Sequence, residues 1–430
     1  MKNFFKKIVS RILILESRLV LLRYKPKIVS ITGSVGKTST KDAVYAVLSG
    51  IAHVRKSDKS YNSEIGLPLT ILGLPNGWNN PLVWIHNIIK GLWLFVGPHK
   101  YPKWLILEVG VGKPGDMKKT ASWLKNDVVI ITAIGETPAH IEFFNSKKHL
   151  VEEKAGLVDT LKKDGILILN ADDEIVLSMK DKTRNLVTTF GFKEGADLVG
   201  SGESIFYDDN QIPKGIIFRV DTGGVSLPVV IEKVFGRNHM YASLAALALA
   251  YGMKWNMIDA IQSLKDYDVS PGRMRLIVGI NNSFIIDDTY NSSPFACEAA
   301  LNTLYNVKLS GRKIAILGDM LELGKHTKEA HENIGKIAKD KVDLLVVVGP
   351  RAKDIKHGAL SVGMAGDKIL ECLDSKEAGF YMKDHIQEGD LILIKGSQGM
   401  RMERTVELLM AKKEDKNKLL VRQDKEWQKR

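Results

Sequence analysis

The stretch Thr32-Gly33-Ser34-Val35-Gly36-Lys37-Thr38-Ser39-Thr40 joins an apolar run at residues 28–32 to a helical pattern that begins near Lys37. Glycines let backbone N–H groups close around phosphate oxygens, the lysine adds a point charge, and the Thr38 hydroxyl can hold Mg²⁺. Position 31 is Ile, so the chain has the shorter pattern G-x-x-G-K-T-[ST] instead of G-x-x-x-x-G-K-[ST]. The strand, glycine turn and helix together predict a phosphate-binding loop.

Short apolar runs alternate with helical stretches along the chain. Runs typical of buried strands occupy residues 28–32, 104–109, 128–134, 165–170, 284–286, 313–317, 344–348 and 391–394. Such alternation indicates parallel sheets covered by helices on both faces. Turn signals crowd the segment from about 197 to 234, which predicts a small β-rich insertion. We therefore expect an α/β fold: a P-loop parallel-sheet ATPase domain with this insertion, followed by a Rossmann-like α/β C-terminal domain.

The breaker Ser270-Pro271-Gly272 marks the expected boundary between the two α/β domains. The expected parts are a basic amphipathic helix over residues 1–26, a central ATP-binding domain over 27–269, a C-terminal domain over 270–412 and a charged tail over 413–430. A cleft between two such domains is the natural place for chemistry.

Composition narrows the class of protein. The 430 residues are 44% hydrophobic and 26% charged, as in globular proteins with more than one core. The two cysteines, Cys297 and Cys372, lie far apart and have no neighbours at metal-ligand spacing. The sequence therefore indicates neither a disulfide framework nor a zinc site, and it favours a reduced, cytoplasmic setting. The formal net charge of +12 suits anionic partners.

Part of this charge lies in the first 26 residues, where cations alternate with apolar residues and Glu16 is the single acid. Their purely apolar runs are far shorter than the ~20 residues that cross a bilayer, and no signal-peptide cleavage site follows. Two interpretations stay open: a helix docked on the protein, or a helix on the inner face of the membrane. The greasy stretch 82–96 is open between core, substrate wall and membrane-facing patch. Aromatic residues are not interleaved with the cations, so we expect no nucleic-acid partner.

Further motifs follow the phosphate loop in order. The first half contains Asn62-Ser63-Glu64-Ile65-Gly66-Leu67-Pro68, Leu107-Glu108-Val109-Gly110, His140-Ile141-Glu142-Phe143-Phe144, Glu153-Lys154-Ala155-Gly156 and Asn170-Ala171-Asp172-Asp173. The second half contains Gly272-Arg273-Met274, Asp287-Asp288-Thr289-Tyr290-Asn291-Ser292-Ser293-Pro294, Leu317-Gly318-Asp319-Met320-Leu321-Glu322-Leu323-Gly324 and Lys395-Gly396-Ser397. From about residue 27 to about 410, this set resembles the Mur ligase family and its folylpolyglutamate synthase relatives.

The resemblance implies a ligase that uses ATP and Mg²⁺ to activate a carboxylate as an acyl phosphate and to join it to an amine. It assigns catalysis to Lys37, Lys154, His140 and Arg273, and metal binding to Thr38, Glu108, His140 and a carbamylated Lys154. It assigns nucleotide binding to Gly33, Ser34, Val35, Gly36, Lys37, Thr38, Ser39, Asn238, His239, Arg273, Asp288, Tyr290 and Asn291.

The blocks that begin at Asp287 and Leu317 favour the branch of the family that adds D-alanyl-D-alanine to UDP-N-acetylmuramoyl-tripeptide in peptidoglycan synthesis. These two molecules are the implied substrates, and a monomer is the default. The chain departs from the family at Gly236-Arg237-Asn238-His239, which replaces Gly-x-His-Asn, and at Gln398, which replaces an arginine that Arg401 could supply. The usual N-terminal UDP-sugar domain has no counterpart, since the loop begins after about thirty residues. Two alternatives are a ligase for a different acid and a nucleotide-dependent switch.

Overall fold

The computed structural model describes residues 2–57, 61, 64–135, 144 and 146–428. The chain forms two compact units, which we describe separately. The N-terminal unit comprises Met1–Gly202, Phe218–Val229 and Asn238–Asp268, and the C-terminal unit comprises Glu203–Ile217, Val230–Arg237 and Val269–Arg430.

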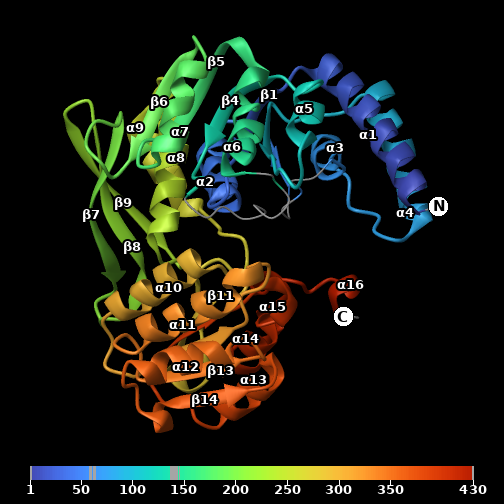
Figure 1. Ribbon diagram of the computed structural model, residues 1–430. Helices are drawn as coiled ribbons and strands as arrows, with labels where there is room; N and C mark the ends of the chain where they lie inside the picture. The colour runs from blue at the N-terminus through green and yellow to red at the C-terminus, as the bar shows by residue number, and fades with distance from the viewer. Residues whose placement is uncertain (1, 58–60, 62–63, 136–143, 145, 429–430) are drawn as a thin grey trace. The chain divides into compact units, whose positions relative to one another are not determined.

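A nine-stranded sheet in the order β2-β3-β1-β4-β5-β6-β7-β8-β9 forms the centre of the N-terminal unit (Figure 1). Neighbouring strands from β2 to β7 pair in parallel. The segment expected as a β-rich insertion supplies β7 to β9, and these strands continue the main sheet. The strands are β1 (Lys27–Thr32), β2 (Val54–Lys56), β3 (Trp104–Glu108), β4 (Asn126–Ile131), β5 (Leu161–Asn170), β6 (Leu186–Gly191), β7 (Leu198–Tyr207), β8 (Pro213–Thr222) and β9 (Val225–Glu232).

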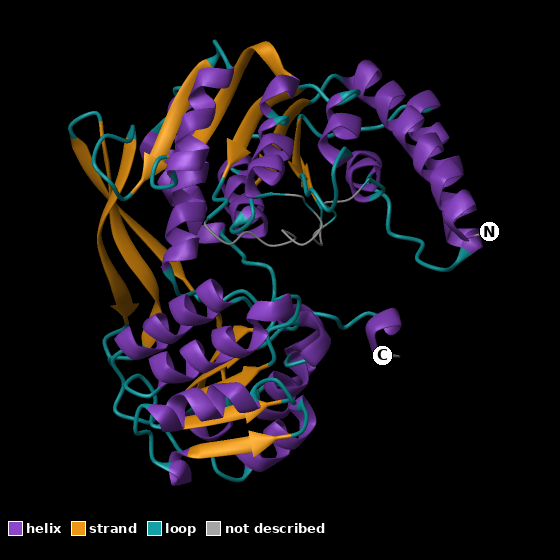
Figure 2. Cartoon of the chain, in the orientation of Figure 1, coloured by secondary structure: helices purple, strands orange, loops and turns teal. Residues whose placement is uncertain are grey.

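Helices lie on both faces of this sheet (Figure 2). One of them, α2, starts directly after the phosphate loop and packs on β1, β2 and β3. The helices are α1 (Lys2–Tyr24), α2 (Lys37–Ser49), α3 (Gly66–Leu72), α4 (Pro81–Val96), α5 (Asp116–Ala121), α6 (Lys147–Ala155), η2 (Val158–Thr160), α7 (Glu174–Leu177), η3 (Ser178–Lys182), α8 (Arg237–Gly252), α9 (Met257–Ser263) and η4 (Leu264–Asp266).

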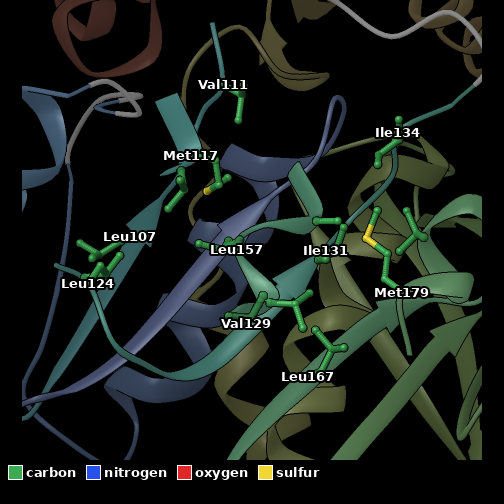
Figure 3. Packing of buried hydrophobic residues seen from close by; sticks show 14 of the residues in the cluster. Leu107, Val111, Met117, Leu124, Val129, Ile131, Ile134, Leu157, Leu167 and Met179 are labelled. Atoms are coloured by element: carbon green, nitrogen blue, oxygen red, sulfur yellow. The ribbon is translucent and has the colours of Figure 1, made fainter. Parts of the chain in front are cut away.

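The core between the sheet and the helices opposite α2 is apolar (Figure 3). Side chains alternate between the two faces of a strand, so every second residue of β3, β4 and β5 points into this layer. The helices α3, α5, α6 and α7 cover it. Its labelled members are Leu107, Val111, Met117, Leu124, Val129, Ile131, Ile134, Leu157, Leu167 and Met179.

A separate apolar cluster ties the N-terminal helices together. Leu13 of α1, Leu69 of α3 and Trp84 of α4 are buried in it. In Figure 1, α1 and α4 lie side by side. Among the described residues, no helix is long and apolar enough to cross a membrane.

The C-terminal unit contains a six-stranded sheet in the order β10-β11-β15-β12-β13-β14, parallel except for β10. The helices α13 and α14 bury side chains on one face, and α10, α11 and α12 cover the other (Figure 2). The strands are β10 (Arg275–Val278), β11 (Phe284–Asp288), β12 (Lys313–Gly318), β13 (Leu344–Val348), β14 (Ile369–Cys372) and β15 (Leu391–Lys395).

The remaining elements of the C-terminal unit are helical. They are α10 (Pro294–Asn306), α11 (Thr327–Ala338), α12 (Lys353–Ser361), α13 (Ser375–Lys383), α14 (Glu403–Leu409), α15 (Lys416–Leu419), α16 (Lys425–Gln428), η5 (Ile280–Asn282), η6 (Gly324–His326), η7 (Gly366–Lys368), η8 (Gln398–Met400) and η9 (Lys413–Asp415). Cys297 of α10 and Cys372 of β14 are both buried, free thiols.

Candidate active site

The phosphate loop is held against the end of β4. The Ser34 N–H donates to the Ala133 carbonyl at 2.6 Å. The Thr132 hydroxyl lies 2.6 Å from the Val35 carbonyl, to which it donates. Gly33 has φ +147°, and a Cβ there would lie only 2.1 Å from Thr132 Oγ1. Glycine is therefore required at 33 because the backbone approaches the neighbouring strand too closely for any side chain.

Two lysines converge on one backbone carbonyl of this loop. Lys37 Nζ donates to the Gly33 oxygen at 2.9 Å, and Lys154 Nζ, from α6, donates to the same oxygen at 3.1 Å. Lys154 is buried, with 3% of its surface exposed. Burial lowers the pKa of Lys154 to about 7, and the positive charge of Lys37 lowers it further in the same direction. The loop thus concentrates positive charge where a polyanion would bind.

Two oxygen ligands for a metal ion meet beside the loop. Thr38, in the first turn of α2, donates through its hydroxyl to Glu108 Oε2 at 3.0 Å. Both side chains are buried, and Glu108 closes the carboxyl end of β3. Hydroxyl and carboxylate oxygens are the ligands that Mg²⁺ prefers, so this pair fits the ion that the sequence implies. The buried hydroxyl of Ser34 lacks a hydrogen-bond partner among the described residues, as expected of a loop built around a ligand.

Lys154 fits a metal ion only in a modified form. An ammonium group cannot ligate a cation, whereas the carbamate formed from its neutral amine is an anion with oxygen ligands. Within the described residues, no group of three or more His, Cys, Asp and Glu side chains is placed to hold a metal. His140, the fourth expected ligand, lies outside the described residues.

The Asn170-Ala171-Asp172-Asp173 signature supports the frame around the loop. Asp173 Oδ2 accepts hydrogen bonds from the N–H groups of Ile134 and Gly135 at 2.8 and 3.0 Å. Asp172 accepts from the turn after β6 and from a tyrosine of α8. These carboxylates therefore position the segment that follows β4 and the start of α8.

The two expected adenine contacts differ in their surroundings. His239 is buried, and its Nδ1 lies 2.8 Å from the Tyr267 hydroxyl. That hydroxyl donates to the Ser39 carbonyl at 3.3 Å, in the first turn of α2. His239 thus supports the helix that begins at the phosphate loop. Asn238 is half-buried at the start of α8.

In the C-terminal unit, the motifs gather at the carboxyl ends of three adjacent parallel strands, β11, β15 and β12. Asp288 and Lys395 are register partners, and their charged groups lie 2.5 Å apart. Lys395 also donates to the Asn291 carbonyl at 2.9 Å. Asp287 is fully buried and accepts from the Gly272 N–H at 3.1 Å. Burial raises the pKa of Asp287 to about 6.

Arg273 lies in the same unit, with its guanidinium 4.0 Å from the centre of the Tyr290 ring. Arg422, from the charged tail, donates to the Tyr290 carbonyl. Glu403 pairs with Arg422 at 2.9 Å and with Arg401 at 2.6 Å. Arg401, considered as a substitute for the family's arginine after Lys-Gly-Ser, is therefore engaged by Glu403.

Each unit thus assembles part of the predicted set. The N-terminal unit brings together Lys37, Thr38, Glu108 and Lys154, and the C-terminal unit brings together Arg273, Asp288, Tyr290 and Asn291. The sequence did not suggest Thr132, Tyr267 or Arg422. Thr132 follows an apolar strand directly, and this position was the only available signal for it.

A parallel-sheet protein with a phosphate loop, two converging lysines and a Thr–Glu oxygen pair belongs to the broad class of P-loop α/β proteins. Comparison with known proteins specifies the family. The Mur ligase middle domain model matches residues 31–250, and the Mur ligase, glutamate ligase domain model matches residues 272–398. The chain belongs to the Mur ligase family, so the resemblance and the expected fold class are confirmed.

Similar proteins point to one branch of this family. UDP-N-acetylmuramoyl-tripeptide–D-alanyl-D-alanine ligase of Bacillus subtilis is 29% identical over 89% of this chain and 76% of that protein. The enzyme of the same name from Synechocystis is 28% identical over 90% of this chain and 76% of its own length. The crystal structure of MurF ligase from Thermotoga maritima in complex with ADP has a TM-score of 0.75 and 25% identity, covering 93% of this chain and 83% of that chain.

Proposed function

We propose that this chain is an ATP-dependent ligase that adds D-alanyl-D-alanine to UDP-N-acetylmuramoyl-tripeptide in the synthesis of cell-wall precursor. The observation that carries the proposal is the convergence of Lys37 and Lys154 on the Gly33 carbonyl, beside the Thr38–Glu108 pair. The names of the similar proteins supply the substrates.

The reaction needs activation because a carboxylate is a poor electrophile. A carboxylate oxygen of the acceptor attacks the γ-phosphorus of ATP, and the bond to the leaving ADP breaks. The amine of D-alanyl-D-alanine then attacks the carbonyl carbon of the acyl phosphate. The C–O bond to phosphate breaks, and the nitrogen loses a proton. The main demand on the protein is to neutralise the anions that come together.

The phosphate loop meets this demand with positive charge. Backbone N–H groups of residues 33–38 and the Lys37 ammonium would bind the β- and γ-phosphates, and Lys37 would exchange the Gly33 carbonyl for phosphate oxygen. Thr38 and Glu108 would hold Mg²⁺, which supplies further charge neutralisation when bound. Because this oxygen pair is already assembled, little reorganisation is needed on binding.

Lys154 supports a carbamate at this position. A lysine with a pKa near 7 carries a large neutral fraction at neutral pH, and the neutral amine is the form that adds to CO₂ with loss of a proton. The carbamate would reverse the local charge and become a metal ligand, with His140 as the proposed further ligand.

We propose nucleotide contacts for several other residues as well. Arg273 would contact the γ-phosphate and Asp288 the ribose, with Tyr290 or Asn291 beside the base. Asn238 would contact the adenine, and His239 would act through Tyr267 on the start of α2.

Phosphate release from ATP tests the proposal, with the two substrates added singly and together. Release that requires both, with a pentapeptide product identified by mass, supports it, and Lys37→Ala is the inactive control. Release that requires an amine and a different acid would favour the alternative ligase. Turnover that ignores every amine would contradict ligase activity and favour the nucleotide switch.

The proposed setting is the cytoplasm, with a monomeric enzyme in peripheral contact with the inner face of the membrane. The described helices provide no membrane span, so contact would occur at the surface of the bilayer. The sequence assigned such contact to residues 1–26, but the structure gives α4 a larger share in it.

A further inference from the structure

One face of α4 presents a continuous row of large apolar side chains to solvent. Their spacing of three and four residues places them on one side of the helix. Each is 48–73% exposed, which is unusual for so many adjacent large apolar residues. The row consists of Leu82, Ile85, Ile89, Leu92, Trp93 and Val96.

The exposed face of α1 continues this surface with a different composition. The apolar residues Ile8, Leu15 and Leu22 alternate with Arg11 and Arg18 along one side of the helix. All five are exposed. A row of this kind places a cation one turn away from each apolar side chain.

The opposite faces of both helices are firmly packed. Trp84 is buried with Leu13 against α3, and the Tyr24 hydroxyl donates to the Leu94 carbonyl at 3.0 Å. A Cβ at Gly91 would lie 2.2 Å from the Glu16 carboxylate, so the helices approach closely there. The exposed faces are therefore held in place by a packed core and do not result from fraying.

The charge of the surface is of one sign. The sequence of α4 contains no acid, and Glu16, the single acid of α1, is 2% exposed. Burial raises the pKa of Glu16 to about 7, which further reduces its negative charge near neutral pH. Lys7, Arg23 and Lys90 add to the exposed cations. An anionic partner complements such a surface.

A small basic pocket opens where α1 ends. It has a volume of about 280 Å³, and its lining includes Lys25, Lys27 and Lys103 together with Tyr24, Tyr101 and Trp104. Three ammonium groups beside aromatic rings suit a phosphate group at an interface between water and apolar material. The pocket thus extends the same combination of cationic and apolar character.

We propose that the exposed faces of α1 and α4 form a membrane-docking surface for a leaflet that contains anionic phospholipid. The apolar row of α4 enters the boundary between headgroups and acyl chains, with Trp93 at the depth that tryptophan prefers. Arg11 and Arg18 bind lipid phosphates while their stems lie along apolar surface. Regular cations within an exposed apolar face favour a bilayer over a protein partner, because the centre of a protein interface is depleted of charge.

This inference deepens the proposed setting and does not depend on the ligase reaction. It is tested by flotation of the full chain with vesicles of phosphatidylcholine alone or mixed with phosphatidylglycerol. One variant is Ile89→Glu/Trp93→Glu, and another is Arg11→Glu/Arg18→Glu. Two controls make the same kinds of change at exposed residues elsewhere, Phe380→Glu on α13 and Arg184→Glu after η3.

We expect wild type and both controls to float with the mixed vesicles, and binding to weaken as salt is added. Each double variant should bind about 30-fold more weakly, because each cation near such a surface contributes about 1 kcal/mol and each buried CH₂ a similar amount. Phosphate release without vesicles should equal that of wild type, which separates failure of docking from failure of the proposed reaction.

Three results would overturn the proposal. Wild type that floats with neither vesicle would do so, as would double variants that bind as tightly as the controls. The third is a concentration-dependent dimer, measured by light scattering, that Ile89→Glu/Trp93→Glu abolishes while vesicles are ignored. In that case the surface would be an interface between two copies of the chain.

Discussion

The carboxyl edges of the two sheets handle their buried lysines differently. In the N-terminal unit, Lys37 and Lys154 both donate to the carbonyl of Gly33, and the nearest carboxylate among the predicted site residues, Glu108, bonds to Thr38. In the C-terminal unit, Lys395 is paired directly with Asp288. Both edges belong to parallel sheets, where ligands commonly bind. Only the first leaves lysine charge without a carboxylate in direct contact among the interactions described above.

The difference indicates two uses of buried charge. A carbonyl dipole stabilises an ammonium group less than a carboxylate does, so the lysines at the phosphate loop can exchange it for an anionic ligand at modest cost. The lysine at the second edge is part of the folded framework, because separating a buried ion pair leaves an uncompensated charge. Substitutions at the two edges should therefore affect different measurements.

The largest expected effect is on catalysis at the first edge. Lys37→Met should reduce ATP turnover about 1,000-fold, because it removes a positive charge placed to stabilise the transferred phosphoryl group. Its free energy of unfolding should change by less than about 1 kcal/mol. Phosphate release and thermal unfolding measure the two, with the exposed Lys180→Met as the control. A large loss of stability without loss of turnover would contradict the comparison.

At the second edge the expected loss is of stability. Lys395→Met should lower the free energy of unfolding by about 3 kcal/mol, because Asp288 loses its buried partner. The double variant Lys395→Met/Asp288→Asn should recover part of that loss. Urea unfolding measures both. Equal stabilities for the single variant and wild type would show that the ion pair is not part of the framework.

The pH dependence of stability gives a third, intermediate effect. The folded protein releases the Lys154 proton near pH 7, whereas the unfolded chain retains it to the ordinary lysine range near 10.5. The unfolded state therefore binds more protons between these values, and stability from this group rises with pH by up to about 1.4 kcal/mol per unit. Lys154→Met should remove that slope in urea unfolding from pH 7 to 9, whereas Lys148→Met, exposed on the same helix, should preserve it. Identical slopes for both variants would contradict the assignment.

The smallest effect concerns the shape of the phosphate loop. Thr132→Val removes the hydroxyl that donates to the Val35 carbonyl and should raise the KM for ATP about fivefold, since one hydrogen bond contributes about 1 kcal/mol. The turnover number should change little. Thr405→Val, which removes a buried hydroxyl bonded to the Ser375 carbonyl in the other unit, is the matched control and should leave KM unchanged. A KM shift of equal size in both would indicate a general loss of stability.

Local sequence predicted the parts of the site that are encoded within a few residues. The loop from Gly33 to Thr38 follows from glycine positions, a strand before it and a helix after it. The parallel sheets followed from alternation of apolar runs and helical patterns. Short strands such as β2 and β14 were not predicted because three or four residues carry too little pattern.

Contacts between distant parts of the chain could not be predicted in this way. Lys154 meets Gly33 across 121 residues, and Lys395 meets Asp288 across 107. The family resemblance named Lys154, but its proximity to Lys37, and hence its lowered pKa, depends on how α6 packs beside the loop. Arg422 lies in a tail that the composition described only as charged, although its side chain is buried against Glu403.

The sequence by itself determined the phosphate loop, the α/β class and the apolar character of residues 82–96. It left open whether that apolar stretch is core, substrate wall or membrane-facing patch. The tertiary structure decided the matter residue by residue, burying Trp84 and exposing Trp93. The physical reason is that hydrophobicity measures what a side chain gains from burial, whereas the packing of α1 and α3 against α4 decides which side chains are buried.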